Sequence, residues 1–367
     1  MMNKCLRQLI FLVCAFFLRW PIWLLIWIAG RSGMFKTLFL LYPTDSSECL
    51  DFCPDIQWLR NFLSGRPTPA GLIMDGWRPI GIYLVIPNQA LELMRRKERA
   101  TVECILRRML WIQKLSGAGA IGLAGQLGSI FEKRHGIPME PPFYSSTFGN
   151  IFSIQKAVNH LVVHAKKPPW QVSVAILGGG ELGEQLEQYL RGDGYRMSMV
   201  DVRYTRAGDV KLTNAMAAGV QLKEVDLVIN LLPRGKDFID CNLHQLISET
   251  ATIIDFSRPQ ICAATIAQNV VMGNRVRRGG LHFFMTLPGG WQRHDLPACS
   301  MPSLVASLSP LPLRNIEEFR LAASQLQFCT ALSHVPARPQ AILGEKSRAL
   351  TSSFPLFSRF MLYMRSR

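Results

Sequence analysis

Short hydrophobic runs alternate along this chain with longer stretches in which apolar residues recur at helical spacing. Residues 89–115 carry apolar side chains at steps of three or four, which predicts one long helix. A second long helix is predicted to begin at residues 146–150 and to end at residues 166–170, where Lys-Lys-Pro-Pro-Trp follows. Buried strands are predicted at residues 37–42, 81–86, 172–177, 225–233 and 251–257, with a last strand at 279–288.

The alternation of strands and helices after residue 172 is typical of a doubly wound parallel sheet. We therefore expect an α/β protein in which an N-terminal α/β substrate domain precedes a Rossmann-type domain, and a C-terminal helix returns to the first domain. The expected boundaries are 34–150 for the substrate domain, 151–290 for the Rossmann domain, 291–332 for a C-terminal helical segment and 333–367 for a basic, poorly ordered tail.

Residues 1–33 form a hydrophobic leader. Residues 9–30 are nearly all apolar and long enough to cross a bilayer, although Arg19 and Pro21 interrupt them. Three interpretations remain open. The leader is a single membrane anchor, a hairpin lying in the plane of the membrane, or an upstream extension of a chain whose true start is Met34.

Charge and cysteine content narrow the classes of partner. Of the net charge of +15, residues 1–33 contribute +4 and residues 333–367 contribute +5. Basic ends of this kind favour an anionic membrane surface or an acidic protein partner, and no nucleic-acid-binding motif is present. The nine cysteines are irregularly spaced, so we expect no metal site. They indicate a reducing compartment, hence a cytoplasmic protein, attached to the membrane if the leader is an anchor.

The clearest motif is Gly-Gly-Gly-Glu-Leu-Gly at residues 178–183, between a predicted strand and a predicted helix. Gly178, Gly180 and Gly183 match the dinucleotide-binding pattern, and the amides around Glu181 and Leu182 begin the helix that would carry the phosphates. Asp201 and Arg203 lie at the distance from which a ribose or its 2′-phosphate is read. The arginine favours NADPH, with NADH as the alternative. Strand ends at Pro233 and Ser257, and the helix start at Gly149 and Asn150, complete the predicted cofactor site.

Cys299 is the best candidate for reactive chemistry. It lies after paired glycines and a polar run, at the predicted N-terminus of a helix, where a thiol pKa is expected to be lowered. His294, five residues earlier, is the candidate acid or base.

The order of these motifs resembles the long-chain acyl-[acyl-carrier-protein] reductase family, relatives of shikimate dehydrogenase and glutamyl-tRNA reductase in architecture. The resemblance rests on the segments around residues 39–45, 122–130, 147–150, 178–183, 253–259, 288–294 and 298–308. It implies that Cys299 takes an acyl chain from acyl carrier protein or coenzyme A as a thioester, which NADPH reduces to a fatty aldehyde. It also places the turn carrying Gly125, Gln126 and Ser129 on the substrate side.

Two other functions stay open. One is a shikimate-dehydrogenase-like oxidoreductase acting on a small polar metabolite. The other is a non-catalytic NAD(P)-binding module at a membrane.

Overall fold

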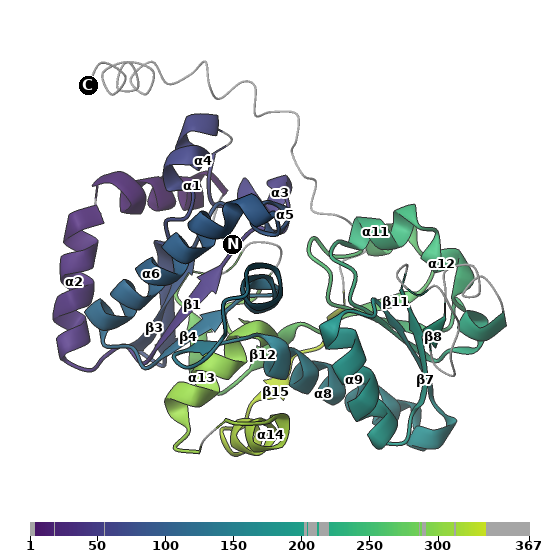
Figure 1. Ribbon diagram of the computed structural model, residues 1–367. Helices are drawn as coiled ribbons and strands as arrows, with labels where there is room; N and C mark the ends of the chain where they lie inside the picture. The colour runs from purple at the N-terminus through teal and green to yellow at the C-terminus, as the bar shows by residue number, and fades with distance from the viewer. Residues whose placement is uncertain are drawn as a thin grey trace.

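Two α/β lobes lie side by side in the computed structural model, joined by a long central helix (Figure 1). The structure describes residues 4–17, 19–54, 56–201, 204, 211–212, 220–285, 287, 291–311 and 313–334. The expected tail at 333–367 lies almost wholly outside the described residues.

The N-terminal lobe contains a six-stranded sheet in the order β13-β2-β3-β1-β4-β5. Strands β3, β1, β4 and β5 are parallel, whereas β2 and β13 run antiparallel to their neighbours. Every residue of β1 is buried, as its unbroken apolar run predicts. The strands are β1 (Thr37–Leu41), β2 (Thr68–Asp75), β3 (Arg78–Val85), β4 (Ala120–Leu123), β5 (Phe143–Tyr144) and β13 (Leu281–Phe283).

Helices cover this sheet, and the helix predicted at residues 89–115 is interrupted. Arg95 is extended (φ −74°, ψ 131°), which divides the segment into α5 (Ala90–Leu93), a 3₁₀ turn (Arg96–Glu98) and α6 (Arg99–Ser116). The single-helix prediction is therefore wrong at its start. The apolar face of α6 is buried as predicted. The preceding helices are α1 (Lys4–Leu12), a π-helix (Val13–Phe17), α2 (Arg19–Arg31), α3 (Ser46–Cys49) and α4 (Gln57–Leu63).

Helix α8 (Thr147–Ala165) crosses to the second lobe, close to its predicted bounds. The second sheet has seven strands in the order β16-β11-β10-β9-β6-β7-β8, all parallel except β16. This confirms the predicted Rossmann-type fold. The strands are β6 (Ser173–Leu177), β7 (Arg196–Val200), β8 (Lys211–Leu212), β9 (Leu227–Asn230), β10 (Thr252–Asp255), β11 (Asn269–Met272) and β16 (Ser333–His334). Its described α-helices after α8 are α9 (Glu181–Gly192), α11 (Gly235–Asp240) and α12 (Leu243–Leu246).

The strand predicted at 279–288 does not belong to the Rossmann sheet. It forms β13, which pairs antiparallel with β2 in the first lobe. Gly280 has a φ of +85° and turns the chain, and the Phe283 ring packs edge-on against Tyr83 at 5.0 Å. The prediction that this strand belongs to the Rossmann sheet is therefore wrong. Its Phe283 packs against Tyr83 of β3, which lies in the sheet of the first lobe.

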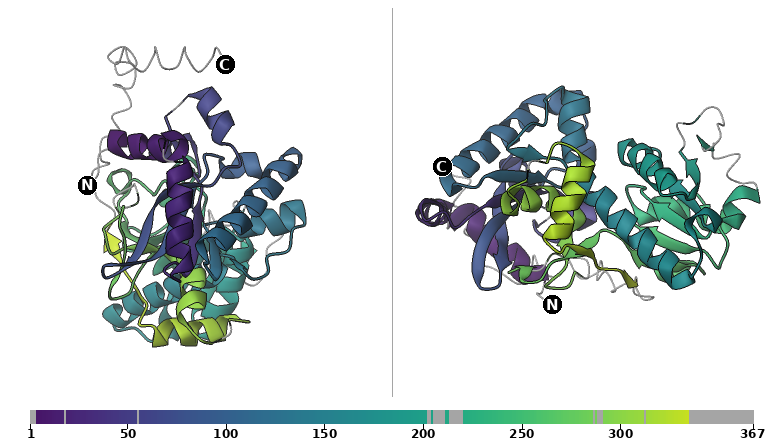
Figure 2. Two further views of the ribbon diagram at one scale, coloured as in Figure 1. Left: turned by 90° about the vertical axis from the view of Figure 1, so that its left-hand side faces the viewer. Right: turned by 90° about the horizontal axis from the view of Figure 1, so that it is seen from below.

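The C-terminal segment returns to the first lobe, as predicted. Strands β12 (Arg275–Arg277), β14 (Leu296–Pro297) and β15 (Cys329–Thr330) form a small antiparallel sheet near the junction of the two lobes (Figure 2). A 3₁₀ turn, η7 (Ala298–Ser300), then leads into α13 (Met301–Leu308), and α14 (Ile316–Gln325) follows. Helix α13 packs closely on β4, because Gly122 leaves room for the hydroxyl of Ser303.

The hydrophobic leader folds as a bent pair of helices. Within the described part of the chain no single helix has the length and apolar composition of a membrane span. Residues 5–16 and 20–31 meet those criteria only together, with a bend of 83° between them.

Candidate functional site at the junction of the two lobes

The predicted dinucleotide motif forms a tight strand-turn-helix. Gly178 has a φ of +108°, which favours glycine. A Cβ at Gly183 would collide with the carbonyl of Gly178, so this glycine allows α9 to pack on β6. A Cβ at Gly180 would meet nothing within 4 Å, so the start of α9 is open on that side. This open backbone at a helix N-terminus fits a dinucleotide pyrophosphate.

Asp201 lies beside this turn, at the end of β7. Its Oδ2 accepts a hydrogen bond from the Gly179 amide at 2.7 Å. Tyr204 packs against the same turn, since a Cβ at Gly179 would meet its hydroxyl. Arg203, the predicted reader of a 2′-phosphate, lies outside the described residues. Of the two predicted ribose-reading residues, the structure thus places Asp201 at the glycine turn.

The first residues of α9 connect the two lobes. The carboxylate of Glu181 accepts a hydrogen bond from Ser129 Oγ at 2.7 Å and pairs with Lys133 Nζ at 3.0 Å. Leu182 is half-buried and packs against the core. The predicted cofactor residue Glu181 and the predicted substrate residue Ser129 are thus in direct contact.

The loop after β10 is held by a buried carboxylate. Asp255 Oδ1 accepts hydrogen bonds from the Ser257 amide (3.0 Å), Ser257 Oγ (2.7 Å) and Asn230 Nδ2 (2.8 Å), and Oδ2 accepts one from the Ile261 amide (2.7 Å). The hydroxyl of Ser257 therefore donates its hydrogen bond to Asp255 within the protein. Pro233 is exposed, and its carbonyl accepts the Arg258 amide at 3.0 Å. These bonds fix the backbone that carries Arg258.

Arg258 extends from this loop to the first lobe. Its Nε donates to Glu48 Oε1 at 3.0 Å, while Glu48 Oε2 accepts the Thr44 amide at 2.9 Å. The guanidinium lies 5.8 Å from the Trp291 ring centroid. Burial works against the cationic form, but the Glu48 carboxylate prevails and raises the pKa of Arg258. A positive charge is therefore held at the junction of the two lobes.

Tyr42 follows β1 and lies near Glu48 and Arg258. Its hydroxyl oxygen accepts the Gln126 amide at 3.0 Å, and a Cβ at Gly125 would collide with it. Gly125 has a φ of +49°. Burial raises the pKa of Tyr42 to about 12, so the phenol is neutral at physiological pH. Gly125 and Gln126 themselves are exposed.

Cys299 lies in η7, half-buried, next to Gly125 and Arg258. Burial raises the pKa of the Cys299 thiol, although a hydrogen bond from the Gly125 backbone and the charge of Arg258 act in the opposite direction. The predicted lowering of the thiol pKa is therefore wrong, because desolvation outweighs both the hydrogen bond from Gly125 and the charge of Arg258.

The remaining predicted residues lie apart from this group or serve in packing. His294 is exposed on a loop, with its ring 5.6 Å from that of His282, and is not among the described groups that shift the Cys299 pKa. Gly149 lies in the first turn of α8, where a Cβ would collide with the carbonyl of Ala298, and the Asn150 amide makes a helical bond to Ser146. Gly149 therefore allows α8 to approach η7 closely.

Sequence reasoning missed Tyr42, Glu48, Arg258 and Trp291. Tyr42 follows β1 directly and Arg258 lies three residues after β10, so the rule that ligands bind at the carboxyl ends of parallel strands would have found them. Glu48 and Trp291 carry no comparable signal. Among the described residues no group of three or more His, Cys, Asp or Glu side chains is placed to hold a metal ion.

Neither a protein-family model nor a curated protein sequence matches this chain. Solved structures share its fold weakly. They include an NADPH-dependent glyoxylate/hydroxypyruvate reductase from Sinorhizobium meliloti (21% identity, 30% of this chain and 52% of that chain, TM-score 0.25) and D-2-hydroxyisocaproate dehydrogenase (12%, 63% and 73%, 0.25). A third is an acyclic imino acid reductase in complex with NADPH and D-Arg (10%, 60% and 74%, 0.26).

This chain covers about half the length of the first of these structures. No family match supports the resemblance to acyl-[acyl-carrier-protein] reductases.

Proposed function

We propose that this chain is an NAD(P)H-dependent oxidoreductase that reduces the carbonyl of a small anionic metabolite. The observation that carries the proposal is Arg258, whose guanidinium is held by Glu48 beside Tyr42 and Cys299, at the same sheet edge as the glycine turn. A fixed, partly buried guanidinium is suited to binding a substrate carboxylate through two parallel hydrogen bonds.

The glycine turn and Asp201 supply the support for the cofactor. Gly178, Gly180 and Gly183 each have the geometry that their place in the motif requires, and the Asp201 carboxylate lies at the turn. When bound, NAD(P)H supplies the hydride that, with one proton, converts the carbonyl to an alcohol and leaves NAD(P)⁺.

The chain's own residues then have distinct tasks. Arg258 binds the substrate anion and Glu48 holds the guanidinium in place. Tyr42 remains protonated, and because its oxygen already accepts the Gln126 amide, its O–H is available to donate to the carbonyl oxygen of the substrate. Oriented donors of this kind polarise a carbonyl toward hydride attack.

A second candidate is reduction of an acyl thioester carried by acyl carrier protein or coenzyme A. Its support is the sulfur of Cys299, which receives a hydrogen bond from Gly125 and lies near the Arg258 charge. In that reaction the Cys299 thiol gives up its proton and its sulfur attacks the thioester carbonyl, so that the carrier leaves as a thiol with that proton. One hydride from NADPH and one proton from solvent then release the aldehyde and regenerate the Cys299 thiol, leaving NADP⁺.

One kinetic experiment separates the two candidates. The full chain is incubated with NADPH or NADH and with panels of small 2-oxo acids and of acyl thioesters, while the absorbance of the reduced nicotinamide is followed. We expect turnover of an oxo acid, and a loss of about 10- to 100-fold in kcat/KM in Arg258→Met, mainly through KM. Arg234→Met, which removes an exposed arginine paired with Asp237, is the control.

Cys299→Ala decides the role of the sulfur. We expect it to retain oxo-acid turnover. Turnover of thioesters alone, abolished in Cys299→Ala, would instead establish the second candidate, and no oxidation of NADPH by any substrate would contradict both.

The cofactor site is tested by Gly180→Ala. The added methyl group meets no protein atom, so the variant should fold normally, yet it lies where the pyrophosphate would approach. We expect NADPH binding, measured by calorimetry, to weaken by about tenfold or more without a change in thermal unfolding. Unchanged NADPH affinity would argue against a dinucleotide at this turn.

A further inference from the structure

Helix α2 has two apolar faces, and only one of them is covered by the protein. On the inner face Ile26 is buried, Trp23 packs edge-on against Trp111 of α6 at 5.3 Å, and a Cβ at Gly30 would collide with the backbone of residues 115–116. A surface helix of a globular protein is expected to be polar on its other face.

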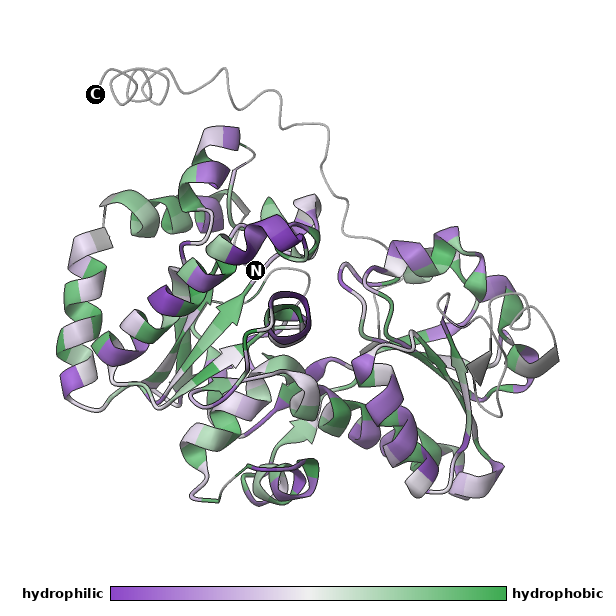
Figure 3. Ribbon diagram, in the orientation of Figure 1, coloured by the Kyte–Doolittle hydropathy of each residue, from purple (hydrophilic) through white to green (hydrophobic). Residues whose placement is uncertain are grey.

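The outer face of α2 is apolar as well. Trp20 is 81% exposed and Leu25 is 63% exposed, and the outward position of α2 at the edge of the first lobe is visible in Figure 3, coloured by hydropathy. Two exposed leucines of α1 lie next to it in the chain. The exposed apolar residues of the two helices are Leu6, Leu9, Trp20, Leu24, Leu25, Trp27 and Ile28, which we call the α1–α2 face. Seven exposed apolar residues on two consecutive helices exceed the single scattered apolar residues of an ordinary soluble surface.

A cavity opens where the two helices bend. Its volume is about 240 Å³, and its lining includes Trp20, Trp23, Phe62, Arg66, Arg108 and Trp111. The guanidinium of Arg66 lies 4.1 Å from the Phe62 ring centroid. Tryptophan and arginine together are the side chains that favour the boundary between lipid headgroups and acyl chains.

The charge of this region has one sign. Residues 1–44 contain no Asp or Glu, while Lys4, Arg7, Arg19, Arg31 and Lys36 are all basic. Arg31 lies over the Trp27 ring at 4.2 Å, at the margin of the α1–α2 face. No acidic residue lines the cavity. Apolar residues flanked only by cations are complementary to an anionic lipid surface.

We propose that the α1–α2 face docks this protein on the surface of an anionic phospholipid bilayer. The bent helices lie in the plane of the interface, with Trp20, Leu24 and Ile28 directed into the headgroup region and the cavity arginines next to lipid phosphates. The 83° bend and the packing of Trp23 and Ile26 on α6 hold both helices against the protein. The proposal is independent of the reaction catalysed at the junction of the lobes.

Vesicle sedimentation of the full-length protein tests the proposal. We expect the protein to pellet with vesicles of phosphatidylcholine and phosphatidylserine, to pellet much less with phosphatidylcholine alone, and to be released by added salt. The triple variant Leu24→Gln, Leu25→Gln, Ile28→Gln should lower the partition coefficient by about tenfold or more. The matched control, Leu91→Gln, Val163→Gln, Leu321→Gln, changes equally exposed residues elsewhere and should bind as the unmodified protein does.

Circular dichroism and thermal unfolding verify that both triple variants fold. Equal binding of the two variants, or no binding to anionic vesicles, would overturn the proposal. So would self-association of the unmodified protein in analytical ultracentrifugation that is lost in the Leu24, Leu25 and Ile28 variant, because the face would then be covered by a second copy of the chain.

Discussion

At the scale of single residues, the junction of the lobes combines a cation, a neutral phenol and a neutral thiol within one group. Burial raises the pKa of both Tyr42 and Cys299, while Glu48 keeps Arg258 charged. Among the described residues, the permanent charge that acts on Cys299 is that of Arg258, from the Rossmann lobe, and the carboxylate that pairs with it is Glu48, from the first lobe. Such a group is better suited to binding and polarising an anionic carbonyl compound than to presenting a reactive thiolate at neutral pH.

This electrostatic setting predicts how Cys299 reacts with iodoacetamide. Because its pKa lies above that of an ordinary thiol, little thiolate forms at pH 7, and the rate of alkylation should still be rising with pH where an ordinary thiol has already levelled off. Arg258→Met removes a charge that lowers the Cys299 pKa, so it should shift the profile further upward. Mass spectrometry of a pulse-labelled sample measures the rate, with the exposed Cys241 as internal reference. Alkylation of Cys299 ahead of Cys241 at neutral pH would contradict the prediction.

The residues of the site were partly predictable. The glycine spacing identified Gly178, Gly180 and Gly183 because each has a local backbone role that is visible in sequence. Cys299 was also singled out, and the structure places it beside Gly125 and Arg258. Its pKa was not predictable, since it depends on burial between two lobes, which no local pattern records. Glu48 was missed for the same reason: it lies 210 residues from its partner, Arg258.

At the scale of elements, periodicity predicted where strands and helices occur more reliably than it predicted which sheet a strand joins. The strand predicted at 279–288 exists in part as β13, but its partner β2 lies some 200 residues earlier in the chain. The break at Arg95 falls in the charged run of residues 95–99, where no apolar side chain shows whether the helical period continues. Pairing and interruption are decided by tertiary contacts, which a single sequence does not display.

The contact between α8 and η7 is the element-level feature that places Cys299. Because the carbonyl of Ala298 approaches Gly149 so closely, Gly149→Ala should destabilise the protein by about 1–3 kcal/mol and displace η7. Gly192→Ala, at the end of α9, is the control. Its Cβ would meet nothing, so it should be neutral or stabilise by up to about 1 kcal/mol. Chemical denaturation measures both. Equal stability of the two variants would show that α8 has room to move.

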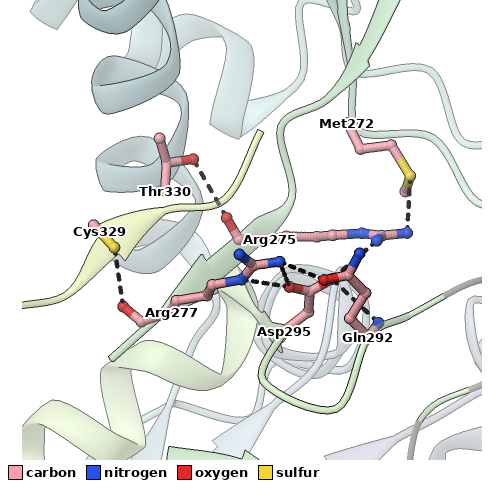
Figure 4. Close-up of polar contacts among 7 residues, drawn as sticks. All are labelled: Met272, Arg275, Arg277, Gln292, Asp295, Cys329 and Thr330. Carbon is pink, nitrogen blue, oxygen red and sulfur yellow. Dashed lines mark hydrogen bonds and ion pairs between the residues drawn. The ribbon is translucent and has the colours of Figure 1, made fainter. Parts of the chain in front are cut away.

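At the scale of the whole molecule, the small sheet β14-β12-β15 connects the lobes through a buried ion-pair cluster (Figure 4). Asp295 is 1% exposed, and its carboxylate accepts from Arg275 Nη1 at 2.9 Å and from Arg277 Nε at 2.8 Å. Strand β12 follows β11 of the Rossmann sheet, and β14 leads into η7 and α13 of the first lobe. The Ala298 amide bonds to Asn274 O, and the Ala331 amide bonds to Arg275 O. The position of η7 relative to the Rossmann sheet therefore depends on Asp295.

Asp295→Asn tests this dependence. The substitution keeps the shape of the side chain but removes the buried negative charge that pairs with both Arg275 and Arg277, so it should cost about 3–5 kcal/mol of unfolding free energy. Glu317→Gln, which removes an exposed ion pair with Arg320, should cost less than about 1 kcal/mol. Urea denaturation followed by tryptophan fluorescence measures both. A loss in Asp295→Asn no larger than that in Glu317→Gln would mean that the apolar contacts of the junction, rather than this cluster, hold Cys299 against the Rossmann lobe.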